Sequence, residues 1–405
     1  MWRKGLSTLI AAMIMLCSVL CVKGLSQERP LEEENRKMEK QTLTEPARFL
    51  LEGVPRVDWG VGTPIGSVTP FSTSLWSCMK FLGEDYSNEY IMGTSGAAFR
   101  LLWKDDWSPD NVDLRLMRKD GNEPLRHAFE AVGYEGEFIG LEEGRDNKAY
   151  FRDRIIESIR DKGHPVLGFG IVPGSPPECC IIAGYDEYGE VLIGWSYYQG
   201  SPEDKRREFE PSGYFRSRNW LTEDTDGIFI IGEKTQRPPQ GEIYRKALKW
   251  ALEAVRTPKI QDHIGRDRYN GLEAYTAWAD DLLRDEDFPA NDMKRMGWIM
   301  MCHDDNVNVV AEGRWCAMQF LRQMAKDEPA MAEDLLAAAE CYETEYNLMR
   351  QCWDLLPNYG PEVRSERQNK VLATPEYRRK IVPLILQARD KDAEAASHIE
   401  RALAR

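Results

Sequence analysis

Two adjacent cysteines, Cys179 and Cys180, come nearest in residue type and position to a catalytic site. A thiol becomes a nucleophile when a neighbouring base or cation raises its thiolate fraction. Glu178 directly precedes the pair, but a carboxylate beside a thiol raises the thiol pKa through like-charge repulsion. The nearest imidazoles belong to His127 and His164, and the sequence places neither beside the thiols. If the chain is an enzyme, Cys179 and Glu178 are its candidate catalytic residues; two inert, buried strand cysteines are the alternative.

Two further patterns contain chemically active residues but lack the spacing of a motif. Residues 93–96 read Gly-Thr-Ser-Gly, without the final glycine and preceding strand of a serine nucleophile elbow, so a turn is predicted. Residues 302–305 read Cys-His-Asp-Asp, and consecutive helical residues cannot all face one ion. The histidines are scattered, so no metal site and no cofactor are predicted. The tryptophans expected to be core residues of the C-terminal half are Trp278, Trp298, Trp315 and Trp353.

The first half of the chain changes from helical periodicity to short β-rich runs. Apolar residues recur at helical spacing over residues 71–82, after a glycine-rich loop at 60–66, with Thr69 as a possible helix cap. Two more helices are predicted near 124–131 and 150–161. The β-branched and aromatic runs that predict strands are 165–171, 179–183, 191–195 and 227–231. Their punctuation by Gly, Pro and Asp predicts an antiparallel sheet packed on helices, which is an α+β domain.

A proline pair within residues 236–241 marks the predicted boundary after that domain, which covers residues 46–235. Beyond it, helical periodicity continues without a strand signal, so an all-α domain is predicted over residues 241–405. The expected helices are 242–255, 271–283, 306–324, 329–355 and 375–404. The cysteines of this half, which either form disulfides or remain buried thiols, are Cys302, Cys316, Cys341 and Cys352.

The N-terminal residues carry the pattern of a targeting signal. Arg3 and Lys4 precede an apolar run over residues 6–22, which predicts a signal peptide or anchor over residues 1–24. Cleavage near Gly24 and retention as an anchor are both compatible with a run of this length. A charged, polar spacer is predicted over residues 25–45. The chain is therefore expected to be extracytoplasmic, with this segment as its membrane contact.

Three stretches of the first half resemble a known family. Residues 90–100 read Tyr-Ile-Met-Gly-Thr-Ser-Gly-Ala-Ala-Phe-Arg, residues 177–186 read Pro-Glu-Cys-Cys-Ile-Ile-Ala-Gly-Tyr-Asp, and residues 189–196 read Gly-Glu-Val-Leu-Ile-Gly-Trp-Ser. Together they resemble the N-terminal domain of the butirosin-biosynthesis acyltransferases and, more distantly, the bacteriocin-processing cysteine peptidases. The resemblance implies a papain-like fold for residues 46–235. It also implies a helical domain of the kind that often follows in that family.

The resemblance implies a catalytic triad whose residues this sequence lacks. The family places a cysteine at a helix N-terminus, a histidine on the first sheet strand and an orienting Asp or Asn on the next strand, which together activate the thiol. The corresponding positions hold Thr69 or Pro70, Glu178 or Cys179, and Gly194-Trp195, respectively. The required residue types are absent from all three places, so a loss of the family's chemistry is predicted.

The leading hypothesis is therefore an exported, non-catalytic binding or scaffold module on a papain-like fold. The alternatives are a thiol-dependent acyltransferase, amidohydrolase or peptidase with a rearranged site, and an assembly protein with an exposed apolar face at residues 381–388. A ligand pocket is expected between the helix and sheet layers; its predicted residues are Thr69, Phe71, Ser95, Glu178, Cys179 and Trp195. The net charge of −14 excludes nucleic acid as a partner and favours a cationic small molecule or peptide.

Overall fold

The structure is a computed structural model that describes residues 46–57, 67–104, 106–173, 178–197, 199, 208–356 and 366–405. The predicted signal peptide, the spacer and the glycine-rich loop at 60–66 lie outside the described residues. Residues Ala47–Arg405 form one compact unit. Within it, helices combine with an antiparallel sheet, which confirms the predicted α+β class.

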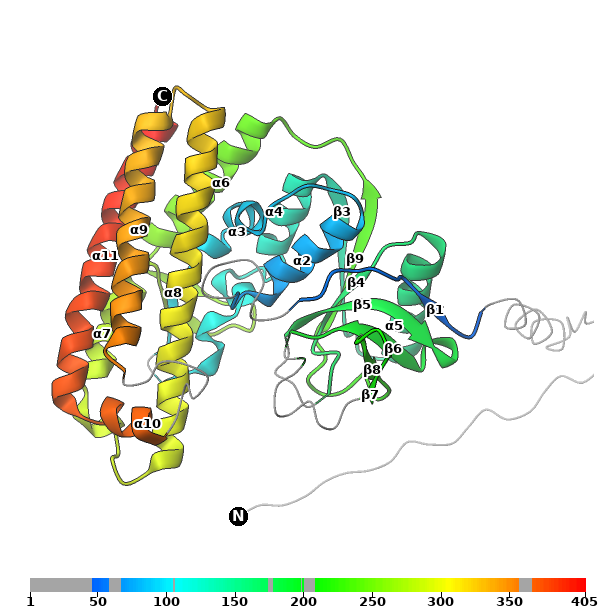
Figure 1. Ribbon diagram of the computed structural model, residues 1–405, viewed down its shortest axis with the longest axis horizontal. Coiled ribbons are helices and arrows are strands. Elements are labelled where there is room, and N and C mark those ends of the chain that lie inside the picture. Colours follow the sequence, from blue (N-terminus) through cyan, green and yellow to red (C-terminus); the bar gives the residue numbers. More distant parts are fainter. Residues whose placement is uncertain are drawn as a thin grey trace, which may run out of the picture. The chain divides into compact units, whose positions relative to one another are not determined.

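A buried antiparallel sheet organises the first half of this unit (Figure 1). Its strand order is β3 (Tyr134–Gly140), β9 (Gly227–Lys234), β4 (Val166–Phe169), β5 (Cys179–Asp186), β6 (Val191–Trp195), β8 (Phe215–Ser217) and β7 (Glu208–Phe209). A two-residue strand, β1 (Phe49–Leu50), pairs with β5. The pairings are antiparallel throughout, so the prediction of an antiparallel sheet over residues 165–231 is confirmed.

Burial explains which strands the sequence predicts and which it does not. Every residue of β4 and β6 is buried, so these strands appear in the sequence as continuous apolar runs. The edge strand β3 alternates buried and exposed positions and carries Glu135 and Glu137 on its exposed side. Its partner strand β9 lies about a hundred residues later in the chain. A local sequence pattern cannot show which distant strand pairs with β3.

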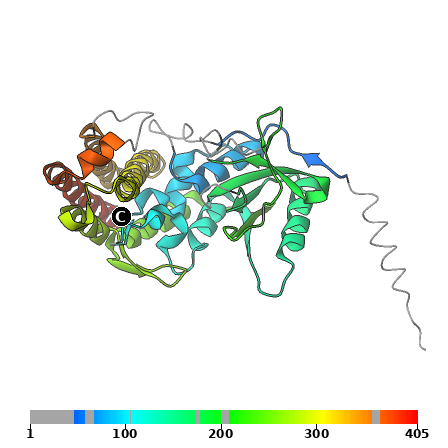
Figure 2. The ribbon, with the colours of Figure 1, turned by 90° about the horizontal axis from the view of Figure 1, so that it is seen from below.

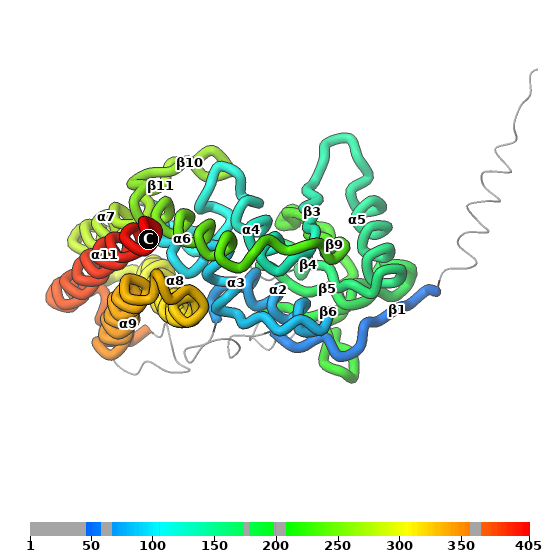
Figure 3. Tube along the Cα trace, turned by 90° about the horizontal axis from the view of Figure 1, so that it is seen from above, coloured from blue at the N-terminus to red at the C-terminus, as the bar shows by residue number. Residues whose placement is uncertain are grey.

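Helices cover both faces of the sheet (Figures 1 and 3). On one face lie α2 (Pro70–Phe81), α3 (Asn88–Ser95) and α4 (Glu123–Val132), and on the other lies α5 (Asn147–Ile156), which continues as a π-helical turn to Asp161. Helices α2, α4 and α5 are the three helices predicted for this half. Periodicity does not predict α3. The turn predicted over residues 93–96 is wrong for residues 93–95, which belong to this helix, and only Gly96, with φ of 82°, leaves it.

The second half is built mainly from long helices that pack side by side (Figures 1 and 2). They are α6 (Gln240–Arg256), α7 (Leu272–Leu283), α8 (Met293–Asp327), α9 (Ala332–Asp354), α10 (Glu366–Leu372) and α11 (Pro375–Leu403). The five predicted helices are present, although α8 begins well before the predicted residue 306. Pro383 lies inside α11, and the helix continues beyond it.

The prediction that the second half contains no strands is wrong. Strands β10 (Lys259–Gln261) and β11 (Asp267–Asn270) form a hairpin, and β11 also pairs with β2 (Leu102–Trp103) of the first half. The hairpin strands have three and four mostly polar residues, too few to show a period of two. The partner strand lies some 160 residues earlier in the chain. This backbone pairing joins the two halves of the compact unit.

The aromatic and apolar residues of the second half mostly face its core. Trp278 and Trp353 are buried as expected, whereas Trp298 is 43% exposed, so its assignment to the core is wrong. Ile381, Ile385 and Ala388 on α11 are fully buried. The exposed apolar face that would favour an assembly protein is therefore not present at this position.

Candidate functional site

The start of α2, where the family resemblance places a nucleophile, is occupied by buried hydroxyl groups. Thr69 is the N-cap residue and Pro70 the first helical residue. The Thr69 side chain does not cap the helix. Its hydroxyl donates instead to Oε2 of Glu312, at 2.7 Å. The position of the family's nucleophile is thus held by a hydroxyl that donates to a buried carboxylate of the same chain.

This carboxylate belongs to Glu312, in the middle of α8. Ser67 Oγ donates to Oε1 at 2.6 Å, and the backbone N–H of Val68 donates to Oε2 at 3.0 Å. Glu312 is fully buried. Burial raises the pKa of Glu312, while the hydrogen bonds from Ser67 and Thr69 and the charge of Arg100 act in the opposite direction. The short donor distances are those of charge-assisted bonds, and a carboxylate near a helix N-terminus is also favoured by the helix dipole.

Arg100 closes the other side of this cluster. One Nη of Arg100 donates to Thr69 Oγ1 at 3.2 Å and to the carbonyl of Val112 at 3.1 Å, and the other Nη donates to the carbonyl of Ala97 at 3.0 Å. Arg100 is also close enough to Glu178 for the two charges to act on each other. The hydroxyl at the start of α2 is therefore bonded to an internal carboxylate and does not lie free beside a base, although Nε of Arg100 is buried without a partner among the described residues.

A second buried cluster lies two residues further along α8, at Arg314. Its Nε donates to Glu345 on α9 at 3.0 Å, and one Nη donates to Asp392 on α11 at 2.5 Å and to the Tyr275 hydroxyl on α7 at 2.9 Å. The other Nη donates to the carbonyl of Ala98, at 2.9 Å, in the 3-10 turn Ala97–Phe99. One side chain therefore connects four helices to the segment that follows α3.

The two clusters contain more buried acids than bases. Their fully buried charged residues are Arg100, Glu312, Arg314, Glu345 and Asp392. Burial raises the pKa of Glu345 well above its usual value, and repulsion by Asp392 raises it further, while Arg314 opposes both. Oε1 of Glu345 is buried without a hydrogen-bond partner among the described residues. Burial also raises the pKa of Asp392, whose Oδ1 likewise lacks a partner among the described residues. Because a second unpaired buried charge is costly, the Glu345–Asp392 pair retains a proton.

The thiol of Cys179 faces α2 and is not activated. Cys179 is buried, and the groups close enough to affect its pKa include Ser74 and Cys78 on α2. Burial raises the pKa of the Cys179 thiol well above its usual value, and Cys180 and Glu178 add to that rise. Cys180 points to the other face of the sheet, since successive strand residues alternate.

A cation close to Cys179 is already engaged. Arg115 is close enough for its charge and the Cys179 thiol to interact. Its guanidinium, however, forms an ion pair with Asp226 and lies 4.5 Å from the centre of the Phe138 ring. Arg115 thus neutralises another acid and does not stabilise a thiolate.

Both histidines named as possible helpers are engaged elsewhere. The ring of His127 lies 4.4 Å from the ring of Trp250, and burial, with a contribution from Lys246, lowers the pKa of His127 to about 4. Nδ1 of His164 lies 3.0 Å from the carbonyl oxygen of Ile231. Neither ring is among the strongest influences on Cys179, so the described residues provide no thiol–imidazole pair there.

The remaining predicted pocket residues lie in different surroundings. Phe71 is buried in the core on α2, and Trp195 pairs with Ile181 across the sheet, which places its indole on the same face as Cys179. The indole N–H of Trp195 donates to the carbonyl of Val54 at 2.8 Å. Ser95 lies apart, at the end of α3.

The backbone around Ser95 is packed against the second half of the chain. Its carbonyl accepts a hydrogen bond from the indole of Trp250 at 3.1 Å. The indole lies over Gly96, where a Cβ would come within 1.8 Å of its nitrogen. Gly96 is thus required by this close approach, and Ser95 is not exposed as a nucleophile.

Sequence reasoning missed Glu312 and Arg314, although one signal marks them. They are the two charged residues within the otherwise apolar stretch 309–317, and charges inside an apolar helical run indicate buried partners. The identity of those partners required the structure.

The seven described cysteines are free and buried, which agrees with the buried-thiol alternative for the second half. Among the helices in the part of the chain that the structure describes, none combines the length and apolar composition needed to cross a bilayer. Comparison with protein-family models and with curated proteins gave no match.

Replacing Glu312 with Gln tests the cluster at the start of α2. We expect this change to lower the free energy of unfolding by about 2 kcal/mol, because the amide turns a donor towards hydroxyl and N–H groups that need an acceptor. Urea unfolding measures the change. Glu333→Gln, on a side chain that is 88% exposed, is the control and should cost less than about 0.5 kcal/mol. Equal effects of the two variants would contradict the assigned role.

The raised pKa of Glu345 predicts a pH dependence of stability. The folded state holds this proton above the pH at which the unfolded chain releases it, so stability falls as the pH rises from about 5 upward, by at most about 1.4 kcal/mol per pH unit. Urea unfolding from pH 5 to 8 should show the wild type losing stability relative to Glu345→Gln. Glu400→Gln is the control: Arg256 lowers the pKa of Glu400, so the contribution of Glu400 is lost only below its ordinary pKa and its difference from the wild type should stay constant from pH 5 to 8. A constant difference between wild type and Glu345→Gln would refute the assignment.

Proposed function

We propose that this chain is an exported, non-catalytic binding or scaffold protein whose first half has a papain-like arrangement. The observation that carries the proposal is the buried carboxylate of Glu312 at the start of α2, held by Ser67, Val68 and Thr69. A cysteine protease or acyltransferase of this fold needs a thiolate at that helix end. Here the chain's own acid already uses the donors and the dipole that would stabilise such an anion.

The papain-like part of the proposal rests on the relation of α2 to β5. The Cys179 thiol interacts with Ser74 and Cys78, so the beginning of β5 lies against the middle of α2. A papain-like arrangement likewise packs the helix that bears the nucleophile against the strand that bears the base. The family resemblance of residues 177–186 points to the same pairing.

The enzymatic alternative lacks support from the residues it would use. A thiol whose pKa is raised by burial holds little thiolate at neutral pH. The carboxyl group of Glu178 raises that pKa further, and an acid of this kind does not serve as the base for a thiol. A binding or scaffold role requires no such activation.

The proposed ligand is a cationic small molecule or peptide, and no nucleic acid is expected. The support is the net charge of −14, because an acidic protein attracts cations over the range of a Debye length and repels phosphate backbones. The region proposed for this ligand is formed by Thr69, Glu178, Cys179 and Trp195. Because Thr69, Cys179 and Trp195 are buried, ligand binding there requires the surrounding side chains to move.

Thiol labelling tests the absence of cysteine catalysis. Iodoacetamide is added to the folded chain at pH 7, and modification is followed residue by residue by mass spectrometry. We expect Cys179 and Cys180 to react at least about a hundredfold more slowly than in the unfolded chain, because labelling requires local opening. Cys316, which is also buried with a raised pKa, is the internal reference. Fast stoichiometric labelling of Cys179 that disappears in His127→Ala or His164→Ala would establish the enzyme instead.

Export is tested by expressing the full chain in a bacterium and separating the cytoplasm from the membrane and extracytoplasmic fractions. We expect the protein outside the cytoplasm, and its intact mass distinguishes cleavage near Gly24 from retention of the anchor. A variant without residues 2–24 is the control and should remain in the cytoplasm. Full-length soluble protein in the cytoplasm would contradict the proposed location.

A further inference from the structure

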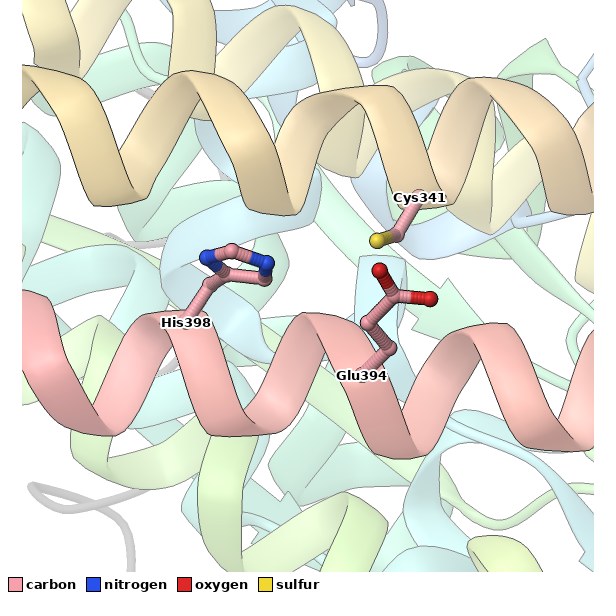
Figure 4. Close-up of side chains that lie close together, drawn as sticks. All are labelled: Cys341, Glu394 and His398. Atoms are coloured by element: carbon pink, nitrogen blue, oxygen red, sulfur yellow. The ribbon is translucent and has the colours of Figure 1, made fainter.

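Helices α9 and α11 bring together three side chains that can bind a metal. Cys341 lies on α9, and Glu394 and His398 lie one turn apart on α11. One ligand atom from each lies within 4.8 Å of the other two. All three side chains point into the space between the two helices (Figure 4). A thiol, an imidazole and a carboxylate form a ligand set suited to zinc and related ions.

The distances are close to those of a coordinated ion. Tetrahedral bonds of about 2.0–2.3 Å place ligand atoms roughly 3.3–3.7 Å apart. The observed spread therefore needs a contraction of about 1 Å. Glu394 is exposed and His398 partly exposed, so both can adjust, while the buried Cys341 fixes the position on α9.

One ring nitrogen of His398 faces Cys341 and Glu394 (Figure 4). The other, Nδ1, contacts the guanidinium of Arg401 and lies 3.7 Å from Oδ1 of Asp334, beyond hydrogen-bond distance. Because a guanidinium only donates, Nδ1 is the acceptor in this contact. Metal binding through the facing nitrogen therefore requires Arg401 to turn away, so that Nδ1–H donates to Asp334, a carboxylate placed as in many metal sites.

The cationic side chains beside the site, Lys391 and Arg401, do not prevent a metal ion from binding. Lys391 pairs with Glu394 at 2.6 Å and is 38% exposed, and Arg401 is 53% exposed. Exposed ion pairs of this kind contribute little energy, so both side chains can turn to solvent. Burial and the carboxyl group of Glu394 raise the pKa of the Cys341 thiol to about 12, so metal binding has to displace its proton to solvent. The resulting thiolate and Glu394 then supply two negative charges to a divalent ion.

We propose that Cys341, Glu394 and His398 form a binding site for a divalent transition metal of the zinc class, with the remaining coordination position open to water. Sequence reasoning predicts no metal site, because Cys341 is more than fifty residues from its partners. The Glu394–His398 spacing of four residues was the available local signal. This site is independent of the proposed function of the first half.

Cobalt(II) is the probe that tests the site. The full chain, without an affinity tag, is treated with a chelator and titrated with Co²⁺. We expect one equivalent of Co²⁺ to bind and to produce a thiolate-to-cobalt charge-transfer absorption band. Added Zn²⁺ should then displace the Co²⁺ and remove the band. Cys341→Ser should abolish the band, and Glu394→Gln and His398→Gln should weaken binding by about tenfold or more.

The control is Cys352→Ala, which removes another buried thiol of α9 and should leave the band unchanged. Circular dichroism confirms that each variant is folded. If Cys341→Ser does not fold, the partly exposed His398 still decides the question. Absence of the band in the wild type, its persistence in Cys341→Ser, or unchanged affinity in His398→Gln would overturn the proposal.

Discussion

The buried guanidinium of Arg314 is the interaction on which much of this structure depends. Five of its hydrogen bonds reach four other segments, including Glu345 on α9 and Asp392 on α11. Removing a buried charge from water is costly, so such a group is stable only while all its partners are in place. Losing any one helix would leave charges unpaired. The hydrogen bonds of Arg314 to the carbonyls of Ala98 and Arg100 therefore fix the position of α8 relative to the first half.

That fixed position explains the chemistry at the start of α2. Glu312 lies two residues before Arg314 on the same helix, so the network that anchors α8 also delivers a carboxylate to Ser67 and Thr69. An anion at the N-terminus of a helix is stabilised by free N–H groups and the helix dipole. In a thiol enzyme this benefit would go to the nucleophile. Here the anion near that helix end is Glu312, held by Ser67, Val68 and Thr69, which precede the helix.

Thiols in this protein therefore differ by surroundings rather than by residue type. Cys179 lies between a sheet and α2 among groups that favour its neutral form. Cys341 lies between α9 and α11, beside the exposed carboxylate of Glu394 and the partly exposed imidazole of His398. The first environment suits packing, and the second suits a cation. The proposed binding or scaffold role and the proposed metal site consequently belong to different parts of the chain.

The sequence determined the parts of this protein that depend on near neighbours in the chain. Helical periodicity predicted α2 and most of the later helices, buried apolar runs predicted β4 and β6, and residue types alone excluded the family's triad. The tertiary structure alone decided the pairing of β11 with β2, the contact of Glu312 with Thr69 and the meeting of Cys341 with His398. Periodicity reflects which face of a segment is buried, whereas a partner tens or hundreds of residues away is selected by packing and charge once the segments have folded together.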